Sequence, residues 1–82
     1  MANKDKKLQR LKSSPHGWAH DTLETLVMAF GFEFRGGTNH AYYVDPDDEE
    51  NFVRVPRHKP VKEYVVRQIV ESIEKRIGRR QP

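Results

Sequence analysis

The sequence predicts an α+β fold of the order α-β-β-β-α, in which a three-stranded antiparallel sheet carries two helices on one face. Two stretches, which end near Phe30 and Ile77, have apolar residues at helical spacing, and three short stretches between them have the alternation or composition of strands. Two apolar helix stripes and one apolar sheet face bury each other when they stack in two layers. A chain of 82 residues has room for one small domain, which we place at residues 14–78.

The N-terminal segment, residues 1–13, lacks hydrophobic periodicity, and we expect it to be a disordered basic arm. Its lysines and arginine give Met1 to Lys12 a net charge of +4, within a formal charge of +3 for the whole chain. A solvated tail and a weak electrostatic tether to a polyanion are both compatible with this charge. Residues 79–82 are expected to form a short basic C-terminal tail.

The first helix is predicted to begin between Ser14 and Thr22, where Ser, Asp and Thr offer N-caps, and to end at Gly31. Its apolar face consists of Trp18, Leu23, Leu26, Val27 and Phe30. The last helix is predicted to begin at Pro60 and to end before Gly78. Its apolar stripe consists of Val66, Ile69, Val70, Ile73 and Ile77.

The strands are predicted at Phe32 to Arg35, His40 to Val44 and Phe52 to Val55, because these stretches alternate in polarity or are rich in aromatic and β-branched residues. Pro56 stops the third strand. The acidic stretch Asp45 to Glu50 lacks the glycine and the ligand spacing of a calcium loop, so we expect a solvated hairpin tip.

Composition excludes several kinds of site. The chain has no cysteine, which excludes disulfides and thiolate zinc sites. His16 and His20 are four residues apart, a spacing found in metal sites, but no third ligand is near them in sequence, so we expect neither a metal nor another cofactor. The longest apolar run, Leu26 to Phe30, is too short to cross a bilayer. We therefore expect a cytoplasmic protein without a membrane partner.

The most informative motif is a double-glycine turn that leads into the second strand, Gly36, Gly37, Thr38, Asn39 and His40. Glycines permit positive φ and leave backbone N–H groups uncovered, so a phosphate can approach closely. Histidine is the residue type most often used for proton transfer by general acid–base catalysis. An ordinary hairpin turn also begins in this way, so the motif by itself leaves both interpretations open.

A second short motif accompanies the turn, and together they resemble a known family. The residues that carry the resemblance are Gly37, Thr38, Asn39 and His40, followed by Val55, Pro56, Arg57 and His58. With the surrounding helices and strands, from about Thr22 to Ile77, they resemble HicA, the small RNA-cleaving toxin of bacterial toxin–antitoxin pairs. The resemblance implies a fold like the double-stranded RNA-binding domain, metal-independent cleavage of mRNA with His40 as the catalytic residue, and inhibition by a HicB-like antitoxin.

On this hypothesis, His40 acts as general acid or base while the 2′-OH of RNA attacks the adjacent phosphate. The residues expected to contact RNA are Arg35, Gly37, Thr38, Asn39, Arg54, Arg57, His58 and Lys59. Strand alternation leaves open which face of the sheet they occupy. It also places one of Tyr42 and Tyr43 in the core and the other beside an RNA base or the antitoxin. The alternatives are a non-catalytic RNA-binding module with the same fold and a protein that only pairs with a partner.

Overall fold

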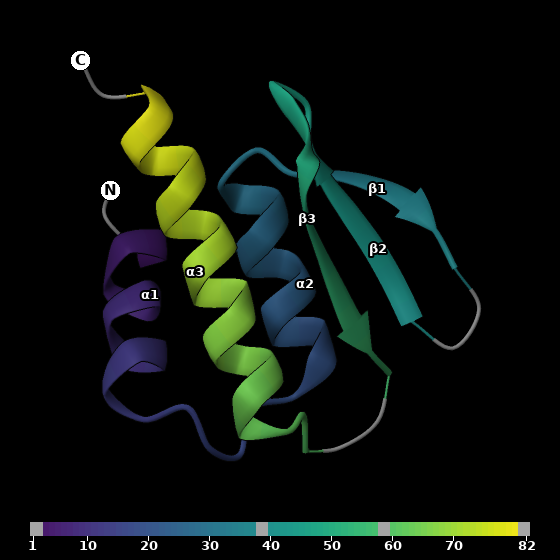
Figure 1. The fold of residues 1–82 in the computed structure, drawn as a ribbon. Helices are drawn as coiled ribbons and strands as arrows, with labels where there is room; N and C mark the ends of the chain where they lie inside the picture. The colour runs from purple at the N-terminus through teal and green to yellow at the C-terminus, as the bar shows by residue number, and fades with distance from the viewer. Residues whose placement is uncertain (1–2, 38–39, 58–59, 81–82) are drawn as a thin grey trace.

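The computed structural model describes residues 3–37, 40–57 and 60–80. Its elements are α1 (Asn3–Ser13), α2 (His20–Ala29), β1 (Glu33–Gly36), β2 (His40–Asp45), β3 (Asp48–Pro56) and α3 (Glu63–Arg80). The strands form one antiparallel sheet in the order β1-β2-β3. Helices α2 and α3 pack against one face of this sheet, and α1 packs against α2 and α3 (Figure 1). The predicted α+β class is confirmed, but two helices rather than one precede the strands.

The expected disordered arm is wrong for Asn3–Ser13, because these residues form α1. Leu8 and Leu11 of this helix belong to the core, with 4% and 1% of their surface exposed. Lys12 adds an ion pair to Glu74 of α3 at 2.6 Å. Only two apolar side chains attach α1 to the core, which is too few for a periodicity that stands out in the sequence.

The ends of the other helices differ modestly from the prediction. Helix α2 begins at His20, and Ala19 precedes it in an extended conformation without a side-chain cap. It ends near Phe30, and Gly31 has the expected positive φ of +95°. Helix α3 begins at Glu63 rather than Pro60 and continues to Arg80, so the expected C-terminal tail is wrong for residues 79 and 80.

The register of the sheet assigns each side chain to one of two faces. His40 lies opposite Pro56, Tyr42 opposite Arg54 and Val44 opposite Phe52, whereas Ala41 and Tyr43 lie opposite Val55 and Val53. The second set is buried against the helices, since successive strand residues point to opposite faces. We call the part of the other face that β2 and β3 form, with His40, Tyr42, Val44, Phe52, Arg54 and Pro56, the open face.

The core lies between the sheet and the helices, and α1 extends it on the far side. Its fully buried side chains come from every helix and from β2 and β3, as Leu11, Leu23, Val27, Ala41, Val55, Val66, Ile69 and Ile73. The predicted apolar faces of α2 and α3 are therefore confirmed at most of their positions. None of the helices formed by the described residues has the length and apolar character that a membrane crossing requires.

The acidic stretch between the last two strands is not simply a solvated hairpin tip, as the sequence led us to expect. Asp48, Glu49 and Glu50 extend β3, so the connection after β2 is only a short turn. Asp45 ends β2 and is completely buried. The prediction failed here because the cation that accompanies Asp45 lies far away in the sequence, at Arg76 of α3.

Arg76 is the centre of a buried polar network that connects α2, β2, β3 and α3. Its Nη1 donates to Asp45 Oδ1 at 2.5 Å and to Asp47 Oδ2 at 2.9 Å, and its Nε donates to the carbonyl oxygen of Phe30 at 2.8 Å. Asn51 Nδ2 donates to the second oxygen of Asp45 at 3.2 Å. The buried charges are thus both paired and hydrogen-bonded, which is the condition for tolerating them in a core.

Candidate functional site

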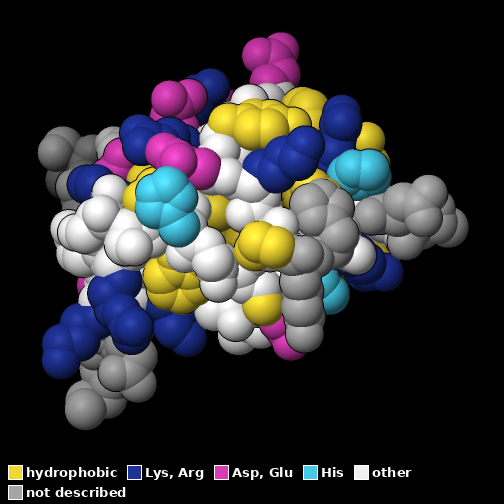
Figure 2. All heavy atoms as spheres, turned by 90° about the horizontal axis from the view of Figure 1, so that it is seen from below, with side chains coloured by type: hydrophobic (Ala, Val, Ile, Leu, Met, Phe, Trp, Pro, Cys, Tyr) yellow, Lys and Arg dark blue, Asp and Glu magenta, His cyan; other side chains and the backbone are white. Residues whose placement is uncertain are grey.

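Several predicted site residues lie at one end of the molecule, which faces downward in Figure 1. The start of β2, the end of β3 and the N-termini of α2 and α3 meet at this end. Seen from below, it carries histidine, Lys or Arg, and hydrophobic side chains close together (Figure 2). Helix N-termini add a partial positive charge to their surroundings. Cations, histidines and hydrophobic side chains therefore share this end.

His40 is the first residue of β2 and is half-buried on the open face. The turn before it requires glycine, since Gly36 and Gly37 have φ of +95° and +123°. A Cβ on Gly37 would lie 1.8 Å from the carbonyl oxygen of His40, an impossible contact. The expected glycine conformations are thus confirmed. The remaining turn residues, Thr38 and Asn39, lie outside the described part of the chain, and so do their predicted roles.

A groove of about 580 Å³ lies beside His40, between β3 and α3. His40, Phe52 and Arg54 border it on the sheet side. Tyr64 borders it on the helix side, and Glu71 of α3 also lines it. Two of these side chains are strongly exposed aromatic rings, with 48% of Phe52 and 60% of Tyr64 accessible to solvent. The groove therefore combines an imidazole, a guanidinium, a carboxylate and two accessible aromatic rings.

The two tyrosines of β2 divide as the alternation predicted. Tyr43 is buried, with 2% of its surface exposed, whereas Tyr42 lies on the open face with 36% exposed. The Arg54 guanidinium lies 5.4 Å from the centroid of the Tyr42 ring, within the range of a cation–π contact. The centroids of the Tyr42 and Phe52 rings are 6.3 Å apart. A continuous aromatic and cationic surface therefore leads along the open face to His40.

A second cluster of polar side chains lies on the helix side of the sheet, around Glu24 of α2. Tyr43 Oη donates to Glu24 Oε1 at 2.6 Å, and His20 Nδ1 donates to Glu24 Oε2 at 2.8 Å. Arg57 approaches the same carboxylate at 3.7 Å. Sequence reasoning missed this cluster, although the spacing of His20 and Glu24, one helical turn apart, was a visible signal for it.

The pKa values of this cluster follow from its contacts. Burial tends to raise the pKa of Glu24, but the hydrogen bonds from Tyr43 and His20 and the charge of Arg57 outweigh it and lower the pKa below its ordinary value. Burial, followed by the hydrogen bond to Glu24 and the charge of that carboxylate, raises the pKa of Tyr43. Glu24 is therefore an ionised acceptor and Tyr43 a neutral donor at neutral pH.

The structure brings only some of the predicted RNA-contacting residues together. Arg54 shares the groove with His40. Arg57 lies on the helix side with Glu24, and Arg35 pairs with Glu33 at 3.3 Å on β1. His58 and Lys59 lie outside the described residues. Phe52 and Tyr64 were missed as site residues, because Tyr64 falls outside the apolar stripe of its helix and Phe52 was read only as the start of a strand.

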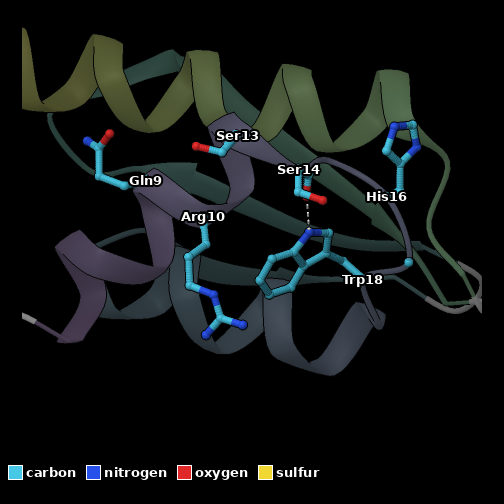
Figure 3. Close-up of a pocket in the computed structure, with 7 residues that line it drawn as sticks. Gln9, Arg10, Ser13, Ser14, His16 and Trp18 are labelled. Carbon is cyan, nitrogen blue, oxygen red and sulfur yellow. Dashed lines mark hydrogen bonds between the residues drawn. The ribbon is translucent and has the colours of Figure 1, made fainter.

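A separate hollow of about 510 Å³ lies between α1 and the segment that follows it (Figure 3). Arg10 and Trp18 point toward each other there, with the guanidinium 5.9 Å from the ring centroid. Trp18 Nε1 donates to the carbonyl oxygen of Ser14 at 2.7 Å. These contacts hold α1 on the domain and leave no polar group of Trp18 for a ligand.

The two histidines with a metal-like spacing do not act together. His16 precedes α2 and pairs with Glu63 at 3.3 Å, whereas His20 lies in α2 and bonds to Glu24. Within residues 3–37, 40–57 and 60–80, no group of three or more His, Asp or Glu side chains is arranged to hold a metal ion.

Comparisons with protein family models, curated protein sequences and solved structures gave no match to this chain. The fold and the site define the chain as a small α+β protein with a half-buried histidine beside an aromatic and cationic groove. Its function is therefore argued from this site and from the motif around His40.

Proposed function

We propose that this protein is a metal-independent endoribonuclease of the HicA type, which cleaves mRNA in the cytoplasm and is inhibited by a HicB-like antitoxin. The observation that carries the proposal is the position of His40. It follows the obligatory glycine turn, is half-buried and borders a groove together with Arg54. An imidazole at the edge of a groove can exchange a proton with a ligand, whereas one enclosed in the core cannot.

The proposed reaction uses the nucleophile that RNA itself supplies. The ribose 2′-oxygen attacks the adjacent phosphorus, the O2′–P bond forms and the P–O5′ bond breaks, which leaves a 2′,3′-cyclic phosphate and a 5′-hydroxyl. His40 accepts the proton of the 2′-OH or donates one to the departing 5′-oxygen, and such proton transfer is worth roughly 10²- to 10⁴-fold in rate. Arg54 faces the charge that develops on the phosphate oxygens. DNA lacks the nucleophile.

Under this proposal, an antitoxin would also bind the open face. A protein that covers Tyr42, Phe52 and Arg54 would block the groove and bury aromatic rings that are now exposed. Aromatic side chains and arginine are enriched in the centres of protein interfaces. The same surface can therefore serve substrate and inhibitor in turn.

One observation favours the alternative, a non-catalytic RNA-binding module. Catalytic histidines are commonly held in place by a carboxylate, and among the described residues only His16 and His20 have such a partner. His40 has none among the described side chains. A single unsupported imidazole gives modest catalysis, so binding and cleavage must be measured separately.

The deciding experiment compares the wild type with His40→Ala on a structured mRNA in the presence of EDTA. We expect cleavage by the wild type, products with 2′,3′-cyclic phosphate ends, and no cleavage by His40→Ala. His16→Ala is the matched control, because His16 is an exposed histidine in the loop before α2, and it should cleave normally. Cleavage by His40→Ala, or cleavage at a 2′-deoxy position, would refute the mechanism. RNA binding without cleavage would favour the alternative.

A further inference from the structure

The open face and its groove collect an unusual share of the exposed aromatic surface. Among the described residues, the large hydrophobic side chains that remain strongly exposed are Met28, Phe34, Tyr42, Phe52 and Tyr64. Three of these five border one continuous surface, since Phe52 and Tyr64 line the groove and Tyr42 lies beside Phe52. Grouped exposed rings of this kind mark a binding surface more often than isolated ones do.

Arg54 and Arg10 differ from the other arginines whose side chains are described, because no described carboxylate pairs with them. Carboxylates of the described residues pair with Arg35, Arg57, Arg67 and Arg76. No described carboxylate lies within ion-pair distance of Arg54, whose guanidinium instead contacts the Tyr42 ring. Its positive charge therefore remains available to an anionic ligand, and the neighbouring Tyr42 and Phe52 rings can contact an apolar one.

The register arranges these groups in three successive rows that end at His40. Val44 and Phe52 form the first row, Tyr42 and Arg54 the second, and His40 and Pro56 the third. Residues directly opposite each other on neighbouring strands are in contact range, and alternate residues of one strand share a face. A ligand that lies along the open face thus meets an aromatic ring, then a cation and a second ring, and then the imidazole.

We propose that the open face binds single-stranded RNA, with bases stacked on Phe52 and Tyr42 and phosphates beside Arg54, so that the strand leads to His40. This inference names the form of RNA that the proposed nuclease takes, and in that respect it rests on the proposed function. Unpaired bases expose both ring faces for stacking, whereas the bases of a duplex are already stacked on each other. Proteins that bind single strands combine these two elements, stacking rings and a basic track.

The test uses full-length His40→Ala, so that cleavage does not disturb binding, and measures the affinity for a fluorescent single-stranded RNA and for the same sequence in a duplex. We expect the single strand to bind more tightly. Adding Phe52→Ala should weaken its binding about 5- to 150-fold, and Phe52→Tyr should restore most of the affinity. Arg54→Met should weaken binding and also flatten its dependence on salt.

The matched control is Phe34→Ala in the same background. Phe34 is as exposed as Phe52, at 51% against 48%, but lies opposite Tyr43 and therefore on the helix-facing side of the sheet. The Phe34→Ala substitution should therefore leave the affinity for single-stranded RNA unchanged. Circular dichroism of each variant checks that the fold is intact.

The outcomes separate this inference from the proposed function. If the wild type does not cleave RNA but Phe52→Ala weakens single-strand binding and Phe34→Ala does not, the binding surface stands and the nuclease is refuted. If the wild type cleaves but Phe52→Ala binds as tightly as its background, the stacking surface is refuted and the nuclease stands. Tighter binding of the duplex also overturns the inference. So does a failure of both RNAs to bind, which leaves a protein as the occupant of this face.

Discussion

Replacement of Arg76 by methionine is expected to destabilise this protein more than any other single change at a charged residue of α3. Arg76→Met keeps the length and apolar stem of the side chain but removes the guanidinium that pairs with the fully buried carboxylate of Asp45. It also removes the donor to the carbonyl oxygen of Phe30. Breaking a buried ion pair by removing one partner costs about 3–5 kcal/mol, because the remaining charge stays buried.

This loss is large for a domain of this size. At about 0.05–0.15 kcal/mol per residue, a chain of 82 residues has a free energy of unfolding of about 4–12 kcal/mol. The loss should lower the melting temperature by at least about 12 °C, because each kcal/mol corresponds to about 4–8 °C in a small domain. Replacing both partners, as in Asp45→Leu with Arg76→Met, should recover part of the loss, since the buried carboxylate is then removed together with the guanidinium.

Urea unfolding followed by the fluorescence of Trp18, the only tryptophan, measures these free energies. Arg67→Met is the matched control, because Arg67 pairs with Glu63 one turn away on the exposed side of the same helix. Such a pair contributes about 0.3–0.5 kcal/mol. If Arg76→Met costs no more than Arg67→Met, the buried network does not stabilise the fold and the reasoning is refuted.

Three further predictions test other parts of the structure. Leu11→Ala should cost about 2–5 kcal/mol in urea unfolding because Leu11 is buried, and an unchanged stability would contradict the packing of α1. Gly37→Ala should destabilise the protein more than Gly36→Ala, since only at Gly37 would the Cβ overlap the backbone of His40; equal thermal melts would contradict this geometry. Because the pKa of Glu24 is lowered in the folded protein, ionised Glu24 contributes stability that is fully present above the ordinary glutamate pKa of about 4.3 and is lost as the pH falls through the lowered pKa. Stability should therefore fall more steeply on acidification in the wild type than in Glu24→Gln. Parallel curves of stability against pH would contradict the hydrogen bonding of this cluster.

The fold was predictable where one strong local pattern decided it. The stripes of α2 and α3 and the aromatic strand β2 each contain enough apolar residues at one period to indicate the element. Helix α1 could not be predicted in this way, because Leu8 and Leu11 are its only apolar residues and the rest are charged or polar. Nor could the burial of Asp45 be predicted, because its partner Arg76 is 31 residues away and only the packed fold brings them together.

At the site, local sequence patterns indicated some of the residues, whereas the register of the strands decided which of them share one face. The sequence indicated the glycine turn, His40 and a set of nearby arginines, but not which arginines share its face. The pairing of His40 with Pro56 and of Tyr42 with Arg54 places Arg54 on the same face as His40, whereas Arg57 follows the end of β3 and approaches Glu24 on the helix side. That pairing depends on a shift in strand register between Val44 and Asp45, which no pattern in the sequence predicts.

His20 and His40 show that a hydrogen bond to a carboxylate does not by itself identify a catalytic histidine. His20 is held by Glu24, but that carboxylate also accepts a hydrogen bond from the buried Tyr43. These hydrogen bonds satisfy polar groups at the edge of the core, which is a structural role. His40 has no such support among the described residues, yet it borders the groove and follows a turn that only glycine can form. A group that transfers protons to a ligand needs access to that ligand first and an orienting partner second. Access therefore favours His40 over His20 as the catalytic residue of the proposed ribonuclease.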